Sequence, residues 1–115
     1  MLKHNNELRR EPIESLRGGK GVTEFTHLLE KEQFHDKGRL FAHARLVPGA
    51  SIGYHKHEGD FETYYVFKGE GTLNDNGKER PVKAGDLVFT NVGESHSIEN
   101  TGTEDLELIA LILFE

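Results

Sequence analysis

Residues 49–69 read GASIGYHKHEGDFETYYVFKG, and two histidines stand two positions apart in the middle of this stretch. Because residues i and i+2 of a β-strand point to the same side, His55 and His57 would present both imidazoles on one face. Glu62 follows a turn at Gly59 and would open a returning strand opposite them. Two imidazoles and one carboxylate make most of a metal site. We therefore predict that the rest of the chain builds a barrel around this stretch and supplies one more ligand.

The candidate for that ligand is His96, on a short predicted strand after Gly93. The four remaining histidines lack a second ligand at strand spacing: His4, His27, His35 and His43. We expect His4 and His35 at the surface. His27 and His43 would either pack in the core or an interface, or lie behind the metal ligands.

Composition limits the classes of protein that this chain can represent. A length of 115 residues suits one domain, and a net charge of −6 argues against nucleic acid, whose binding needs a basic surface. The absence of cysteine excludes disulfides and thiolate metal sites and fits a reducing compartment. The N-terminus has no apolar run that would suggest a signal peptide, and the longest apolar run, residues 108–114, is too short for a membrane span. We expect a cytoplasmic location.

Short apolar segments alternate with Gly, Asn and Asp turns, a pattern typical of an all-β sandwich or barrel. We divide the chain into an N-terminal arm, residues 1–21, and a single domain, residues 22–115. The arm would hold one short strand near residues 13–16. In the domain, strands are predicted at 22–29, 40–47, 52–57, 62–67, 72–73, 79–82, 87–90, 95–99 and 106–114. The first of these is ambiguous, because residues 22–34 also carry helical spacing.

Two glycine-bounded motifs in this pattern closely resemble those of the cupin superfamily. The first motif consists here of Gly49, His55, His57, Glu62 and Gly69. The second consists of Gly85, Gly93, His96 and Asn100, with Asn91 at the position where the family has proline. The fifteen residues between the motifs, 70–84, match the spacing of small bacterial cupins.

The resemblance implies an antiparallel jelly-roll β-barrel of six to eight strands. It also implies that His55, His57, Glu62 and His96 bind one divalent metal inside the barrel. A ligand set without sulfur suits Mn²⁺, Fe²⁺, Ni²⁺ or Zn²⁺, and we favour Mn²⁺, then Fe²⁺. In an octahedral ion, four protein ligands leave two positions for water, substrate or dioxygen.

Strand parity predicts which side chains line the pocket beside the metal. Tyr64 shares the side of Glu62 and would either hydrogen-bond a substrate oxygen or pack in the core. Ile98 shares the side of His96, and Ala44 would leave room near the metal. Phe89 would line the cavity or fill the core.

Three functions remain open, and no catalytic residue is assigned. The chain is similar to one barrel of the oxalate decarboxylases, which are two-barrel manganese cupins, so a small carboxylate such as oxalate is the expected ligand. Ile52 stands where those enzymes carry arginine, and their lid glutamate has no counterpart, which counts against their route of decarboxylation. The alternatives are a metal-dependent dioxygenase, resembling the quercetin or cysteine dioxygenase cupins, and a binding module without turnover.

The predicted last strand, residues 106–114, is apolar on both faces. A barrel with open edges must cover them, and a two-fold dimer that pairs sheet edges or N-terminal strands would do so. We therefore expect a homodimer, as is common among small cupins.

Overall fold

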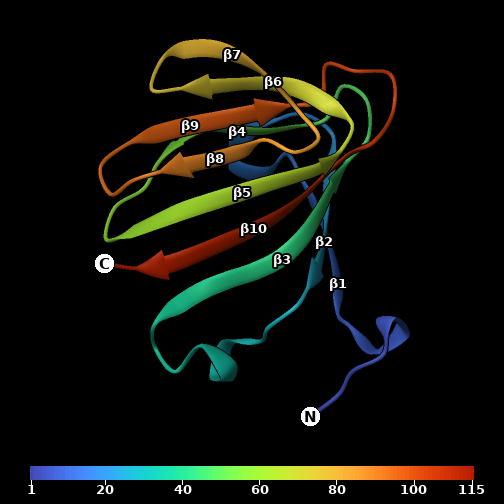
Figure 1. The fold of residues 1–115 in the computed structure, drawn as a ribbon, viewed down its shortest axis with the longest axis vertical. Coiled ribbons are helices and arrows are strands. Elements are labelled where there is room, and N and C mark those ends of the chain that lie inside the picture. Colours follow the sequence, from blue (N-terminus) through green and yellow to red (C-terminus); the bar gives the residue numbers. More distant parts are fainter.

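Alternating apolar and polar residues, interrupted by glycine turns, fold the chain into ten strands in two antiparallel sheets (Figure 1). A computed structural model describes residues 1–115. The strands are β1 (Arg10–Glu14), β2 (Val22–His27), β3 (Gly38–Leu46), β4 (Ser51–Lys56), β5 (Asp60–Lys68), β6 (Glu70–Asp75), β7 (Lys78–Lys83), β8 (Leu87–Thr90), β9 (Ser95–Glu99) and β10 (Leu106–Phe114). Three short 3₁₀ helices accompany them: η1 (Asn5–Glu7), η2 (Leu16–Gly18) and η3 (Lys31–Phe34).

The two sheets divide the chain unequally. The larger sheet has the order β1-β2-β3-β10-β5-β8, and the smaller has the order β4-β9-β6-β7. The all-β antiparallel fold predicted from the sequence is confirmed. Ten is the number of strands predicted from the sequence pattern, and it exceeds the six to eight that the family resemblance implies, because β1 and β2 extend the larger sheet at one edge.

The N-terminal residues join the larger sheet. β1 pairs with β2 in a register that runs from Arg10 opposite Thr26 to Glu14 opposite Val22, and η2 lies between these strands in the chain. The ambiguous segment forms a strand that ends at His27, and the later residues of helical character form η3. The boundary between arm and domain stays a prediction.

The core lies between the inward faces of the two sheets. Ala42, Ala44 and Leu46 of β3 are fully buried, as the alternation of that strand predicts. β10 lies between β3 and β5, and its Leu106 and Leu108 are also fully buried. Burial of each such leucine stabilises the fold by about 2 kcal/mol. The remaining inward-facing positions near one end of the barrel carry polar side chains, and these build the site.

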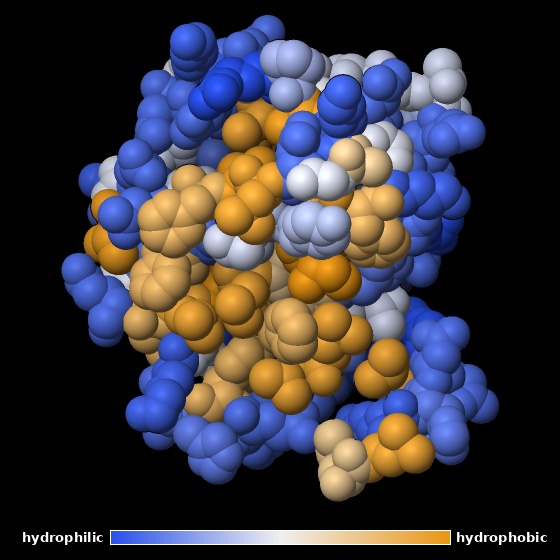
Figure 2. Space-filling model, in the orientation of Figure 1, coloured by the Kyte–Doolittle hydropathy of each residue, from blue (hydrophilic) through white to orange (hydrophobic).

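The outer face of the larger sheet is unusually apolar. Orange side chains gather over β3, β10, β5 and β8 in Figure 2, and Tyr65, Phe67, Leu87 and Phe89 are among the most exposed large apolar residues of the chain. A contiguous apolar patch of this kind marks an interaction surface more often than a bare monomer surface. The only helices are the three short turns, and none has the length or apolarity to cross a membrane.

Candidate metal centre

Four side chains far apart in the sequence converge inside the barrel. Ligand atoms of His55, His57, Glu62 and His96 all lie within 4.8 Å of one another. Nε2 of His96 is 3.0 Å from Oε1 of Glu62, 3.1 Å from Nε2 of His57 and 3.2 Å from Nε2 of His55. The structure therefore brings together all four residues that the sequence singled out.

Three neighbouring elements position these groups. His55 on β4 stands opposite His96 on β9, so that hydrogen-bonded strands carry two of the imidazoles. β4 has an irregularity between Ile52 and His55 and ends at Lys56, one residue before His57. Glu62 lies on the inward face of β5. The strand irregularity re-aims the end of β4, which is what a β-bulge commonly does beside a functional site.

The outward nitrogen of each imidazole is held by a second group. Nδ1–H of His57 donates to Oδ1 of Asp60 over 2.6 Å, and Nδ1–H of His55 donates to the carbonyl oxygen of Gly53 over 2.7 Å. Nδ1 of His96 is 2.8 Å from the hydroxyl of Thr90. Such partners fix the ring orientation and the tautomer of a metal-binding histidine. All three Nε2 atoms are thereby directed at the same point.

Burial and mutual contacts perturb the charges of this cluster. Burial by itself raises the pKa of the Glu62 carboxyl, but hydrogen bonds with His57 and His96 prevail and lower it to about 2. Burial lowers the pKa of His55 to about 4. The hydrogen bond with Glu62 raises the pKa of His57 despite the opposing effect of burial. At neutral pH the cluster therefore holds an ionised carboxylate and a neutral His55.

The donor set fits a divalent metal. Because Nδ1 of His55 and of His57 carries a hydrogen, Nε2 of each ring presents a lone pair to the centre once that nitrogen is deprotonated. The Glu62 carboxylate faces the same point, with its Oε1 3.1 Å from Nε2 of His57 and 3.0 Å from Nε2 of His96. One cation would satisfy all of them, and imidazole with carboxylate suits first-row divalent ions. Metal and protons would then compete for the site.

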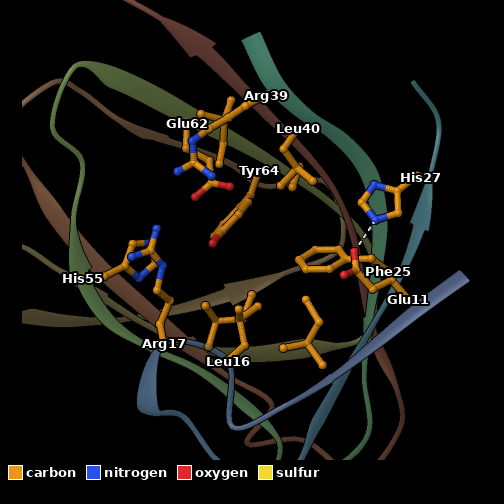
Figure 3. A pocket seen from close by; sticks show the side chains of 14 residues that line it. Glu11, Leu16, Arg17, Phe25, His27, Arg39, Leu40, His55, Glu62 and Tyr64 are labelled. Atoms are coloured by element: carbon orange, nitrogen blue, oxygen red, sulfur yellow. Dashed lines mark hydrogen bonds and ion pairs between the residues drawn. The ribbon is translucent and has the colours of Figure 1, made fainter. Parts of the chain in front are cut away.

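Tyr64 supports the centre from one side. Its ring is stacked on that of His96, with centroids 5.1 Å apart and planes inclined by 12°. Burial, reinforced by the neighbouring Glu62 carboxylate, raises the pKa of the Tyr64 phenol well above its usual value. Tyr64 thus stays a neutral hydrogen-bond donor, and its hydroxyl points into the cavity beside the cluster (Figure 3).

A cavity of about 320 Å³ opens beside the cluster and is lined by residues of both the barrel and the N-terminal segment. His55 and Glu62 form its metal-side wall, and Arg17 and Arg39 bring guanidinium groups to the same wall (Figure 3). Apolar side chains form much of the remaining lining: Ile13, Leu16, Phe25, Leu40, Ile52 and Ile112. The cavity therefore has guanidinium groups beside the cluster and apolar side chains beyond it, a combination that suits a small organic anion.

Of the four predicted pocket residues, the structure places only Tyr64 on the cavity wall. Ala44 and Ile98 face inward but lie deeper, in the packed core, and Ala110 and Ile52 line the cavity instead. Phe89 points outward on β8, where it is 52% exposed and contacts Phe61, so it neither lines this cavity nor fills the core. Strand parity gave the side of the sheet for Ala44 and Ile98 but not their depth.

The other histidines do not join the cluster. Nε2 of His27 is 2.7 Å from Oε1 of Glu11 on the wall across the cavity from His55 (Figure 3). His43 lies on the outer face, 2.8 Å from Oε1 of Glu107. Neither contacts a predicted metal ligand.

Two features of the site were not predicted. Asp60 accepts from His57 and also pairs with Nε of Arg39 over 2.8 Å. Its even spacing from Glu62 is the available signal, but the predicted strand begins at residue 62, whereas β5 begins at Asp60. Arg17 reaches the cavity from η2, and no local pattern in the sequence signals this.

Comparison with known proteins supports the fold and identifies similar chains. The profile of the family described as "Cupin domain" matches residues 42–112. An oxalate-binding protein of Thermotoga maritima is 57% identical over 113 residues, which cover 98% of this chain and 93% of that protein. A crystal structure from Thermotoga maritima, described as a predicted oxalate decarboxylase, is 56% identical with a TM-score of 0.94 and full coverage of both chains. KdgF from Halomonas sp. matches at 16% identity and a TM-score of 0.79, covering 100% of this chain and 95% of that one, which concerns the fold alone.

Proposed function

Because the chain belongs to the cupin family, we propose that it binds one divalent metal through His55, His57, Glu62 and His96 and holds a small carboxylate, oxalate, at that metal. Mn²⁺ is the proposed ion, with Fe²⁺, Ni²⁺ and Zn²⁺ as alternatives. The observation that carries the proposal is the convergence of these four ligand atoms beside a cavity with two guanidinium groups. The similarity over nearly the whole chain to a protein named for oxalate binding supports the ligand.

A divalent ion in this centre would act as a Lewis acid toward a bound carboxylate. The chain itself supplies the surroundings. Arg17 and Arg39 contribute positive charge, Tyr64 contributes a neutral hydroxyl, and the apolar walls restrict water. These groups favour an anion in the cavity, where electrostatic attraction is stronger than in bulk water.

Binding without turnover is the first candidate, and decarboxylation of oxalate is the second. In that reaction the carbon–carbon bond of the oxalate monoanion breaks, and one formate and one carbon dioxide form. The similarity to a structure described as a predicted oxalate decarboxylase favours this second candidate. The third, a metal-dependent dioxygenase, would consume dioxygen with an aromatic or thiol substrate.

Calorimetric titration of oxalate into the Mn²⁺-loaded protein tests the proposal, with His57→Ala as the control that lacks the metal. We expect binding by the wild type and none by the variant. Oxalate binding by the variant, or none by the metal-loaded wild type, would contradict the proposal. Formate analysis of the oxalate samples, and an oxygen electrode with the Mn²⁺-loaded protein and an aromatic or thiol substrate, then separate the three candidates. Formate production without oxygen consumption indicates decarboxylation, and oxygen uptake indicates a dioxygenase. If neither is observed, the protein is a binding module.

We also propose a homodimer that buries the apolar outer face of the larger sheet, and a cytoplasmic location, which the absence of cysteine favours. Ile109, Leu111 and Leu113 of β10 lie between the exposed aromatic residues of β5 and the side chains of β3 on this face. A second copy carries the same apolar patch, so a two-fold contact would match apolar surface with apolar surface. β1 is an edge strand of the larger sheet, so its free edge could also pair with an N-terminal strand of the second copy, as expected from the sequence.

A further inference from the structure

Arg17 is the one arginine of this chain without a hydrogen bond or ion pair. The other five each have an oxygen partner: Arg9, Arg10, Arg39, Arg45 and Arg80. Arg17 nevertheless lines the cavity beside His55, and its guanidinium points inward (Figure 3). A guanidinium with free donors on the wall of a cavity is a ready partner for a planar anion such as a carboxylate.

The backbone at Arg17 is held in an uncommon conformation. Its φ of 55° and ψ of 32° lie in the left-handed region, which is unfavourable for a residue other than glycine. A strained backbone persists only where its surroundings enforce it, and it is often found at functional sites.

Two glycines enforce this arrangement by letting η2 lie directly on β4. A Cβ at Gly53 would stand 2.0 Å from the carbonyl oxygen of Arg17, and one at Gly19 would stand 2.1 Å from the carbonyl oxygen of Ser51. The backbone N–H of Ser51 donates to the carbonyl oxygen of Lys20 over 2.8 Å, which fastens the following turn to the same strand. The position of Arg17 is thus tied to β4.

β4 is also the strand that carries His55. The carbonyl oxygen of Gly53 accepts the Nδ1–H of His55, and the missing side chain of Gly53 is what admits Arg17. One residue therefore orients a predicted metal ligand and seats the segment that brings the guanidinium. This arrangement sets Arg17 in a fixed relation to the metal centre.

The remaining charged groups of the cavity already have partners. Arg39 pairs with Asp60, His27 pairs with Glu11, and Glu62 belongs to the metal cluster. Arg17 is the cation left without a partner. Its positive charge acts on the Tyr64 hydroxyl, partly opposing the rise of the Tyr64 pKa, which places the two groups near each other.

We propose that Arg17 anchors one carboxylate of a ligand whose other carboxylate lies at the metal, so that the N-terminal segment, residues 10–19, selects dicarboxylates for this cavity. The segment lies outside residues 42–112, which match the family profile, and it supplies Ile13 and Leu16 to the cavity wall beside Arg17. The inference rests on the proposed function and adds to it a residue for specificity.

The test compares oxalate affinity of the Mn²⁺-loaded wild type with Arg17→Gln, Arg17→Lys and Arg80→Gln. Arg80→Gln removes the same charge from an exposed side chain on β7, away from the cavity. We expect roughly tenfold weaker binding for Arg17→Gln, an intermediate value for Arg17→Lys, and no change for Arg80→Gln. Metal content, measured on each sample, should stay at the wild-type level.

Salt dependence distinguishes an anchoring charge from a structural role. Added sodium chloride should weaken oxalate binding more in the wild type than in Arg17→Gln, because the variant has lost the screened attraction. Wild-type affinity and salt dependence in Arg17→Gln would overturn the role of Arg17 while leaving oxalate binding intact. Absence of oxalate binding by the metal-loaded wild type would overturn the proposed function and, with it, this inference.

Discussion

Asp60→Asn should weaken metal binding although Asp60 is not a predicted ligand. Oδ1 of Asp60 accepts from His57 over 2.6 Å and Oδ2 accepts from Arg39 over 2.8 Å. An asparagine keeps the shape but has one acceptor oxygen, so one of the two hydrogen bonds is lost, as is the negative charge that makes the His57 ring more basic. The side chain of His57 is only 1% exposed, so water cannot replace the missing partner.

The expected loss follows from this geometry. A hydrogen bond to a charged partner contributes about 1.5–3 kcal/mol, and carboxylates behind metal-binding histidines change metal affinity by about 10- to 100-fold. We therefore expect the Kd for Mn²⁺ to rise by about 10- to 100-fold in Asp60→Asn. Titration followed by the paramagnetic resonance signal of free Mn²⁺ measures it.

The matched control is Asp105→Asn. Asp105 also pairs with an arginine, Arg45, over 3.1 Å, but on the outer surface away from the cluster. The control removes the same charge and should leave the Kd unchanged. An Asp60→Asn affinity within about twofold of both the wild type and the control would refute the role assigned to Asp60.

Three further outcomes are expected. In the metal-free protein, folding lowers the pKa of Glu62 from 4.5 to about 2 and that of His55 from 6.5 to about 4, so both groups stabilise the folded state when deprotonated. The Tm should therefore fall as the pH drops from 6.5 toward 2, and a Tm that does not change over this range would contradict the expectation. Gly53→Ala should destabilise the fold by roughly 1–3 kcal/mol in urea unfolding, because its Cβ would meet the Arg17 carbonyl; wild-type stability would show that the contact is not needed. Leu87→Lys should convert the proposed dimer to a 13.0 kDa monomer in light scattering, and a variant with the mass of a dimer would exclude that face as the interface.

Local chemistry explains why the strands and the four clustered residues could be predicted. Glycine turns and the alternation of apolar and polar residues can be recognised within short segments, and His55, His57 and Glu62 lie within one such segment. Predicting His96 as the fourth ligand required only one more strand, residues 95–99, which follows a recognisable turn at Gly93. Each of these features depends on neighbours a few residues away.

The rest depends on contacts between distant segments. Parity places Ala44 on the inner side, but its depth follows from how β3, β10 and β2 pack together. The place of Arg17 depends on a left-handed backbone and on two glycines that let η2 approach β4. Gly53 and the cavity residues His55 and Tyr64 lie far from Arg17 in the sequence, so no local sequence pattern reveals its place beside the cluster.

The central claim is that the four converging side chains hold one metal ion. Anomalous diffraction from crystals of protein loaded with Mn²⁺, recorded on both sides of the manganese absorption edge, tests it directly. We expect a single strong peak among His55, His57, Glu62 and His96, at the point toward which their ligand atoms are directed. No peak at that point, or a peak held by other residues, would contradict the account.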